Sequence, residues 1–190
     1  MAMAAPKFTP LDQLLAAGED ARLELVEGEL CAVETTGEHA GAQAGVLAPV
    51  FTGYNRRPGG SGAPGGWWIV VECTIQFTIS EVLRPDLAAW RREHCPERPG
   101  GFPVRVTPDW VCEVLSPGTA YRDLGHKRRV YHAAKVGHYW LVDAEREEVT
   151  VLRWTLEGYV VHEIEVIDGA FRAPPFEAVA IEFASLFGKE

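Results

Sequence analysis

Residues 108–116 read Pro-Asp-Trp-Val-Cys-Glu-Val-Leu-Ser, and the run from Trp110 to Leu115 is apolar except for Glu113. A short apolar run of this kind, followed by turn-forming residues, predicts a strand in the centre of a sheet. Side chains alternate between the two faces of a strand, so Glu113 shares its face with Val111 and Leu115. We therefore expect Glu113 to be buried, where an ionised carboxylate is costly unless it is paired or bound to a metal.

Polar residues that carry chemistry lie on either side of this strand. Upstream, residues 82–90 read Val-Leu-Arg-Pro-Asp-Leu-Ala-Ala-Trp. They predict one strand over residues 81–90, with an edge or a bend at Pro85 immediately before Asp86. Downstream, a helix is expected over about residues 120–135, and it carries Asp123 and Lys127 four positions apart. Residues at this spacing face the same side of a helix.

The remaining pattern predicts the fold class. Strands are expected over residues 22–25 and 29–33 around a Glu27-Gly28 turn, over residues 67–79 and 138–142, and in a hairpin over residues 149–167. Helices are expected near residues 9–18 and over residues 38–56. This order predicts a single α/β domain over residues 1–190, with a central mixed sheet flanked by helices and with N-terminal and C-terminal β-hairpins.

The composition restricts the classes of protein to which the chain can belong. The formal net charge of −9 argues against a broad basic face of the kind that holds nucleic acid, so any phosphate-binding surface must be local. The apolar runs are too short to cross a membrane, and the N-terminus lacks an apolar signal core, so we expect a cytoplasmic protein. The four cysteines form no Cys-x-x-Cys pair, so we do not expect a structural zinc site.

Asp86, Glu113 and Lys127 together are two carboxylates and an amine. Taken singly, each has an ordinary interpretation: a turn residue, a buried glutamate paired with an arginine, and a solvated helix lysine. In combination they fit a metal-assisted cut of a phosphodiester, because Mg²⁺ is held by one or two carboxylates and polarises a phosphoryl oxygen or its bound water. A nearby lysine can orient that water or stabilise the developing charge.

The ordered motifs resemble the Uma family of restriction endonucleases, which belongs to the PD-(D/E)XK nuclease superfamily. The resemblance covers roughly residues 8 to 165. It is carried by the following segments: Leu23-Glu-Leu-Val-Glu-Gly-Glu29, Pro85-Asp86, Glu113-Val-Leu-Ser-Pro117, Asp123-Leu-Gly-His-Lys127, Tyr131 and Gly137-His-Tyr-Trp-Leu-Val-Asp143.

The resemblance implies roles for individual residues. Asp86 and Glu113 correspond to the motif acids that bind Mg²⁺ or Mn²⁺, and the backbone carbonyl of Val114 is the further ligand implied. The superfamily lysine expected two residues after Glu113 is replaced here by Leu115. The Uma arrangement implies that Lys127 on the following helix takes its place, with Asp123 positioning it.

Several further residues are weaker candidates. Glu72 is a possible auxiliary acid, although a structural carboxylate paired with a base explains it equally well. The Leu-Glu-Leu alternation predicts that Glu24 faces solvent, and His39 is expected to be a capping or surface residue. The candidates for phosphate contact are Arg122, Arg128 and Arg129.

Two functions remain open from the sequence. The first is a Mg²⁺-dependent endonuclease that hydrolyses DNA, acting as a homodimer because two sites cut two strands most simply. The second is a catalytically degenerate nuclease fold that serves as a binding or regulatory module. RNA is a weaker alternative for the substrate.

Overall fold

The structure is a computed structural model, and it describes residues 8–33, 36–59, 64–116, 118 and 120–189. Pro117, at the end of one motif quoted above, lies outside the described residues. The elements follow one another in this order: α1 (Pro10–Ala17), η1 (Glu19–Ala21), β1 (Leu23–Val26), β2 (Glu29–Ala32), α2 (Gly37–Tyr54), β3 (Trp67–Val71), β4 (Ile75–Gln76), β5 (Val82–Leu83), β6 (Leu87–Arg91), β7 (Trp110–Leu115), η2 (Arg122–Lys127), α3 (Arg128–Ala133), β8 (His138–Asp143), β9 (Glu148–Thr155), β10 (Gly158–His162), β11 (Val166–Ile167), β12 (Ala170–Phe171), β13 (Ile181–Glu182) and α4 (Phe183–Leu186).

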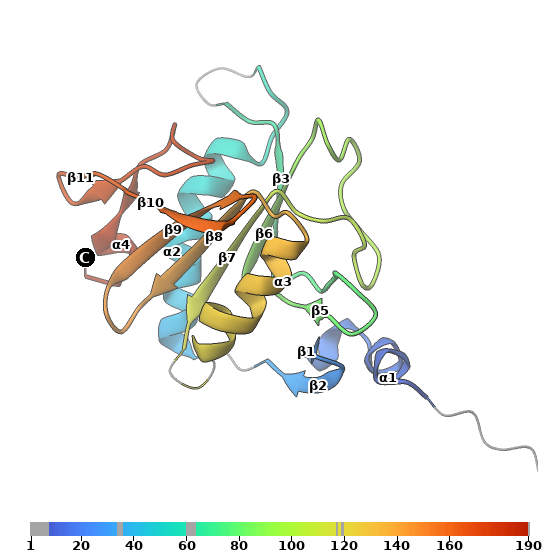
Figure 1. The fold of residues 1–190 in the computed structure, drawn as a ribbon. Helices are drawn as coiled ribbons and strands as arrows, with labels where there is room; N and C mark the ends of the chain where they lie inside the picture. Colours follow the sequence, from blue (N-terminus) through green and yellow to red (C-terminus); the bar gives the residue numbers. More distant parts are fainter. Residues whose placement is uncertain (1–7, 34–35, 60–63, 117, 119, 190) are drawn as a thin grey trace, which may run out of the picture.

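A six-stranded mixed sheet forms the centre of the fold, with the strand order β10-β9-β8-β7-β6-β3. Only β7 and β8 are parallel among these pairs, and the connection between them contains η2 and α3. Figure 1 shows α2 behind this sheet and α3 in front of it. The mixed α/β class predicted from the sequence is therefore confirmed, and the strand Trp110–Leu115 is confirmed as an interior strand.

The alternation of side chains along β7 separates two hydrophobic cores. Trp110 and Cys112 pack with α2 and the C-terminal segment, which includes Phe176. Val111 packs on the opposite face with Tyr131 of α3. Glu113 shares the face of Val111, so its carboxylate is directed toward η2 and α3.

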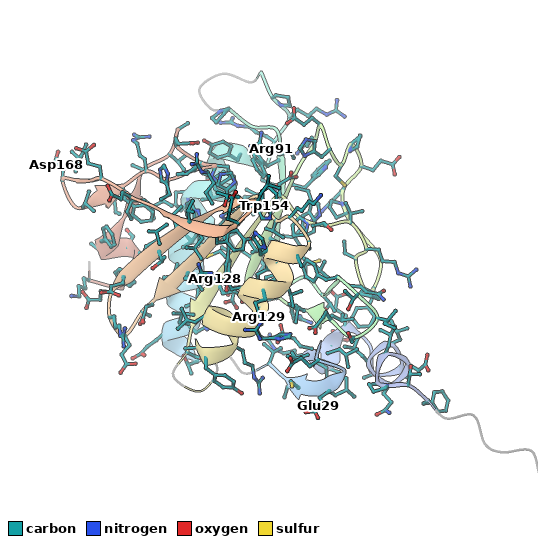
Figure 2. The ribbon with its side chains drawn as sticks, viewed as in Figure 1. Glu29, Arg91, Arg128, Arg129, Trp154 and Asp168 are labelled. Atoms are coloured by element: carbon teal, nitrogen blue, oxygen red, sulfur yellow. The ribbon has the colours of Figure 1, made fainter. Side chains whose placement is uncertain are left out.

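The N-terminal hairpin belongs to a second sheet. β1 pairs with β2 and with β5, and the strand order is β2-β1-β5-β4. Figure 1 shows this hairpin below the helical segment that ends in α3, and Figure 2 marks it by Glu29 on β2. The hairpin around Glu27-Gly28 is thus confirmed, and it places β1 next to the segment that carries Asp86.

The expectation of one strand over residues 81–90 is wrong. The chain forms β5 and β6, which belong to different sheets, with Arg84, Pro85 and Asp86 between them. Proline has no N–H to donate to a ladder, so a strand is interrupted where it occurs. The interruption leaves Asp86 at the start of β6, where its side chain is free to contact β7 and α2.

A cis peptide bond precedes Pro103, and another precedes Pro175. The C-terminal segment forms a three-stranded sheet, β11-β12-β13, followed by α4. Within the described part of the chain, none of the helices has the length and apolar content that crossing a bilayer requires.

Candidate active site

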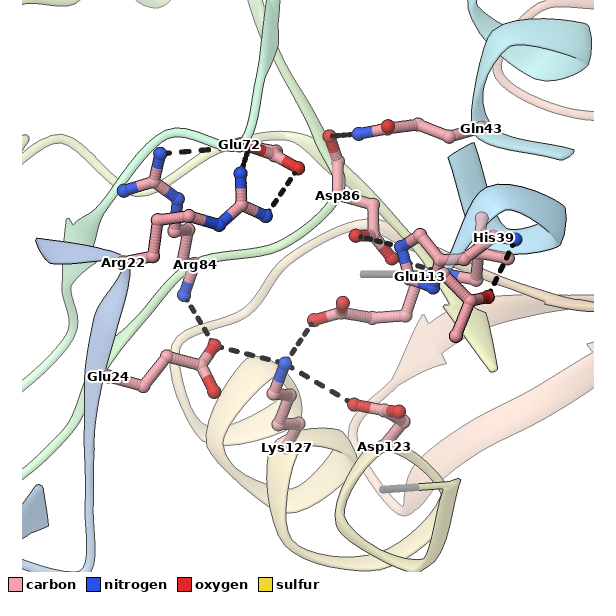
Figure 3. A network of polar contacts seen from close by, with 12 residues as sticks. Arg22, Glu24, His39, Gln43, Glu72, Arg84, Asp86, Glu113, Asp123 and Lys127 are labelled. Carbon is pink, nitrogen blue, oxygen red and sulfur yellow. Dashed lines mark hydrogen bonds and ion pairs between the residues drawn. The ribbon is translucent and has the colours of Figure 1, made fainter. Parts of the chain in front are cut away.

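Lys127 lies at the centre of a buried cluster of charged side chains. Its Nζ is 3.0 Å from Glu24 Oε1, 3.1 Å from Glu113 Oε1 and 3.3 Å from Asp123 Oδ1. Figure 3 shows these three contacts converging on the ammonium from β1, β7 and η2. Because an ammonium carries three N–H donors, this arrangement supplies one acceptor for each.

The local backbone explains why Lys127 points inward. η2 is a single turn of π-helix, in which Asp123 and Lys127 are both buried, and α3 continues from it. The hydroxyl of Tyr139 on β8 donates to the Asp123 carbonyl at 3.0 Å, and Tyr131 Oη donates to Glu113 Oε1 at 2.5 Å. Single π-helical turns occur frequently at functional sites, and this one directs its acid and its base toward β7.

Asp86 is held from two sides. Its Oδ1 is 2.6 Å from His39 Nε2, and its Oδ2 accepts the Val114 N–H at 2.6 Å. Gln43, one helical turn after His39 on α2, donates from Nε2 to the Asp86 backbone carbonyl at 2.8 Å. Asp86 is therefore fixed both at its backbone and at its carboxylate, and only 5% of its surface is exposed.

A cavity of about 30 Å³ joins these groups, which is space for roughly one or two water-sized species. Four of its lining residues are buried carboxylates, namely Glu24, Asp86, Glu113 and Asp123. Lys127, Arg84 and Arg122 supply the cationic side chains of the lining, and His39 and Val114 also contribute. The structure therefore brings Asp86, Glu113, Asp123, Lys127 and Arg122 of the predicted set to one cavity.

The electrostatics of the cluster follow from burial and mutual proximity. Burial raises the pKa of the Glu113 carboxyl well above its usual range, although the Lys127 charge opposes this. Burial likewise raises the pKa of Asp123 to about 6 against the same opposing charge. Burial lowers the pKa of the Lys127 ammonium, but Glu113, Glu24 and Asp123 outweigh burial, and the pKa lies well above its usual value.

His39 responds in the same way to its partner. Burial lowers the pKa of its imidazole, but the hydrogen bond and the charge of Asp86 outweigh burial and raise the pKa above its usual value. Strongly shifted ionisable groups around one cavity are typical of functional sites.

Three other candidates lie outside the cavity. Glu72 follows β3 and accepts two hydrogen bonds from Arg22, at 2.7 and 2.8 Å, with Arg84 Nη2 at 3.7 Å. Its contacts are those of a paired structural carboxylate. Arg128 Nη2 donates to the Tyr159 carbonyl at 3.1 Å, and Arg129 is exposed at the edge of a separate groove. Figure 2 shows both arginines on α3.

Two expectations about the neighbours of the site are wrong. Glu24 does not face solvent, because it is 3% exposed and contacts Lys127. β1 is covered on both faces here, so the alternation of Leu-Glu-Leu does not separate a wet face from a dry one. His39 is neither a cap nor a surface residue, because it is 7% exposed and hydrogen-bonds Asp86. The sequence signal for His39 was Gln43 four residues later, which marks a polar stripe on a helix that is otherwise rich in small and apolar residues.

The lining of the cavity is rich in carboxylates, which are the ligands that a hard divalent cation prefers. Among the residues that the structure describes, no group of three or more histidine, cysteine, aspartate or glutamate side chains is arranged to hold a metal ion. The chemistry of the cavity nevertheless suits a hard cation, because four buried carboxylates face one buried ammonium. The N–H and C=O of one residue leave a strand on the same side, so the Val114 carbonyl is directed toward the side from which Asp86 contacts β7.

Comparison with known proteins gives the family. The model of the Uma2 family, whose description is "Putative restriction endonuclease", matches residues 8–182. The chain belongs to the Uma2 family. The fold is similar to the crystal structure of "a putative nuclease belonging to DUF820" from Anabaena variabilis ATCC 29413, with a TM-score of 0.68 and 18% sequence identity over 94% of this chain and 97% of that chain.

At this level of identity the likeness shows the fold alone. No curated protein matches the chain. The family predicted from the motifs is confirmed, and the Uma2 match extends past residue 165 into the C-terminal sheet.

Proposed function

We propose that this Uma2 protein is a metal-dependent nuclease of the PD-(D/E)XK type that hydrolyses phosphodiester bonds in DNA. The observation that carries the proposal is the cavity in which Asp86, Glu113 and Lys127 meet, as the family motifs predict. The description of the Uma2 family and the nuclease named in the structural comparison support the same class of reaction.

In the proposed reaction, Asp86 and Glu113, with the Val114 carbonyl, would hold Mg²⁺ or Mn²⁺. A cation bound there would supply Lewis-acid chemistry, which polarises a phosphate and lowers the pKa of water. His39 and Gln43 keep Asp86 in place through the contacts at 2.6 and 2.8 Å. Hydrogen-bonded partners of this kind orient metal ligands.

Lys127 acts in this proposal as a charged donor rather than as a base. Three carboxylates within 3.3 Å keep its ammonium protonated, so it orients the attacking water and stabilises negative charge on phosphate. The water oxygen attacks phosphorus and gives up a proton to solvent, the P–O bond to one sugar breaks, and the departing oxygen takes up a proton from solvent. Of the three arginines predicted to contact phosphate, Arg122 lines the cavity and is assigned that contact in this proposal.

The test is a cleavage assay with Mg²⁺, Mn²⁺ or EDTA, on single-stranded, duplex and supercoiled DNA and on RNA. We expect the wild type to cut DNA only with the metal. Asp86→Asn, Glu113→Gln and Lys127→Met should each lower the rate by roughly 10²- to 10⁴-fold, the range for loss of a catalytic group. Glu148→Gln on β9 and Lys189→Met, which remove exposed charges outside the cavity, should cut as the wild type does. Equal rates for all variants would overturn the assignment.

The second candidate is a nuclease fold that binds without cutting. It is favoured by the net charge of −9 and by the ammonium that already pairs with Glu113. Calorimetry separates the two functions. Binding of Mn²⁺ that is lost in Asp86→Asn supports the nuclease, whereas no heat up to millimolar Mn²⁺, together with no DNA binding at low salt, supports the binding module.

A further inference from the structure

Glu24 connects three parts of the protein at a single oxygen atom. The residue lies on β1 in the N-terminal hairpin, and its side chain is buried. Its Oε1 accepts the backbone N–H of Arg84 at 2.7 Å and lies 3.0 Å from Lys127 Nζ. Arg84 stands two residues before Asp86, so Glu24 joins the hairpin to the segment that carries Asp86 and to the turn that carries Lys127 (Figure 3).

The three acceptors of the Lys127 ammonium differ in what they can do during the reaction. Glu113 is a proposed metal ligand, and its Oε1 also accepts a hydrogen bond from Tyr131 Oη, so its position depends on groups other than Lys127. Asp123 is on the same π-helical turn as Lys127 and moves with it. Glu24 is the acceptor that belongs to a different sheet, and the Arg84 N–H fixes its position independently of η2. Glu24 can therefore hold the Lys127 ammonium in position without depending on the position of η2.

We propose that Glu24 is a positioning residue, which holds the Lys127 ammonium so that one N–H remains directed at Glu113 and the water beside it. This inference rests on the proposed role of Lys127 in the nuclease. With Glu24 and Asp123 each accepting one N–H, the third N–H stays directed at Glu113 and at the water or phosphate beside it. The N-terminal hairpin is then a part of the active site, although its sheet is separate from the central one.

Two simpler roles for Glu24 can be compared with positioning. Oε1 of Glu24 accepts from the Arg84 amide and lies near the Lys127 ammonium, so a metal would have to bind through the other oxygen, and the Mn²⁺ affinity of a Glu24 variant distinguishes that role from positioning. An ion pair that only stabilises the fold does not need to meet the other groups of a cavity, whereas Glu24 lines the cavity together with Asp86 and Glu113.

The experiment compares Glu24→Gln with Glu29→Gln, which removes an exposed carboxylate from the same hairpin. The activity-independent readout is ¹⁵N NMR of the lysine ammonium groups, in which proton exchange with solvent reports how firmly Lys127 is held. We expect exchange at Lys127 to be roughly tenfold faster or more in Glu24→Gln, because a hydrogen bond between charged groups is lost. Exchange should be unchanged in Glu29→Gln.

The kinetic readouts distinguish positioning from binding. In Glu24→Gln, kcat should fall by roughly 10- to 100-fold, while KM for DNA and the affinity for Mn²⁺ by calorimetry stay within about twofold of the wild type. Glu24→Asp keeps the charge and serves if the glutamine variant does not fold; it should give intermediate exchange and an intermediate kcat. Unchanged exchange at Lys127 in a folded Glu24 variant overturns the proposal, as does a large loss of Mn²⁺ affinity. If the wild type cuts no nucleic acid but exchange still rises in Glu24→Gln, the nuclease proposal fails and the hold of Glu24 on Lys127 stands.

Discussion

The replacement Lys127→Met tests whether the buried cluster is charged as the geometry indicates. Methionine keeps an unbranched apolar stem of similar length, so the change removes mainly the ammonium. Its three carboxylate partners have side chains that are only 3–5% exposed, so they lose their shared cation away from water. Removal of one partner from a buried ion pair costs about 3–5 kcal/mol.

That cost is large against a total stability of about 5–15 kcal/mol, the usual range for a domain, so the variant should fold but unfold at lower urea concentration. For a chain of this length, each 1 kcal/mol shifts Tm by about 2–4 °C, which predicts a fall of about 6–20 °C. The measurement is the free energy of unfolding in urea at pH 7, with Lys189→Met as the matched control. Lys189 also pairs with a carboxylate, at 2.6 Å from Glu147, but its side chain is 60% exposed. Its loss should cost less than about 1 kcal/mol.

The stability of the Lys127→Met variant should also depend on pH and on added Mn²⁺. With Lys127 present, the pKa of Asp123 is about 6. Without the ammonium, that pKa and the pKa of Glu113 rise further, so the folded variant takes up protons at a higher pH than the unfolded chain does. Its deficit in stability should therefore shrink as the pH falls from 7 toward 5. Mn²⁺ should restore part of the deficit, because it supplies positive charge to the same carboxylates. A variant within 1 kcal/mol of the wild type at pH 7, with no response to pH, would refute the reasoning.

Four further predictions concern the site and the core. Glu113→Gln should lower the cleavage rate by roughly 10²- to 10⁴-fold without lowering the free energy of unfolding at pH 7, because it removes a carboxylate whose ionisation burial opposes. His39→Gln should weaken Mn²⁺ binding by about 10- to 100-fold in calorimetry, because the imidazole orients Asp86. Burial lowers the pKa of His138 to about 4, so the wild type gains stability as the pH rises from about 4 to 6.5; His138→Gln should lose that gain, at most about 3 kcal/mol, in urea titrations across this range. Gly45→Ala should destabilise the fold by about 1–3 kcal/mol in the same assay, because a Cβ there would lie 2.7 Å from the α4 backbone.

Each of these has a result that would contradict it. A Glu113→Gln protein that cuts DNA at the wild-type rate would remove Glu113 from the site. Unchanged Mn²⁺ affinity in His39→Gln would mean that the histidine does not orient the ligand. A His138→Gln protein with the same pH profile as the wild type would show that another group controls that range, and a neutral Gly45→Ala would show that α4 can move away at no cost.

The elements that carry the site were predictable where local pattern decides them. The strand around Glu113 is predicted by its apolar run, and the inward direction of its carboxylate follows from alternation against Val111. The pairing of Asp123 with Lys127 follows from their spacing of four residues. These inferences need only the sequence within one strand or one turn.

Glu24 and His39 could not be predicted in the same way. Their partners are distant in the chain: Lys127 lies on the connection after β7, and Asp86 follows His39 by 47 residues. Periodicity describes the faces of one element but not which other element covers each face. On β1 this explains why Glu24 was predicted to face solvent and is buried instead. The hairpin pairs with β5, and Glu24 contacts Lys127 of η2.

The cluster is better explained by function than by stability. Buried ion pairs contribute little net stability, because desolvation offsets their attraction, and well-packed apolar side chains of the same volume often do better. Here the imbalance is greater still, since four buried acids line a cavity with one buried ammonium, and neighbouring acids add to burial in raising the pKa of Glu113 and of Asp123. This cluster of charged side chains lies at the junction of two sheets and a π-helical turn. It lowers the stability of the fold relative to packed apolar side chains at the same positions. Glu113→Gln is therefore the variant in which stability and activity should separate: stability unchanged or higher, and the cleavage rate much lower.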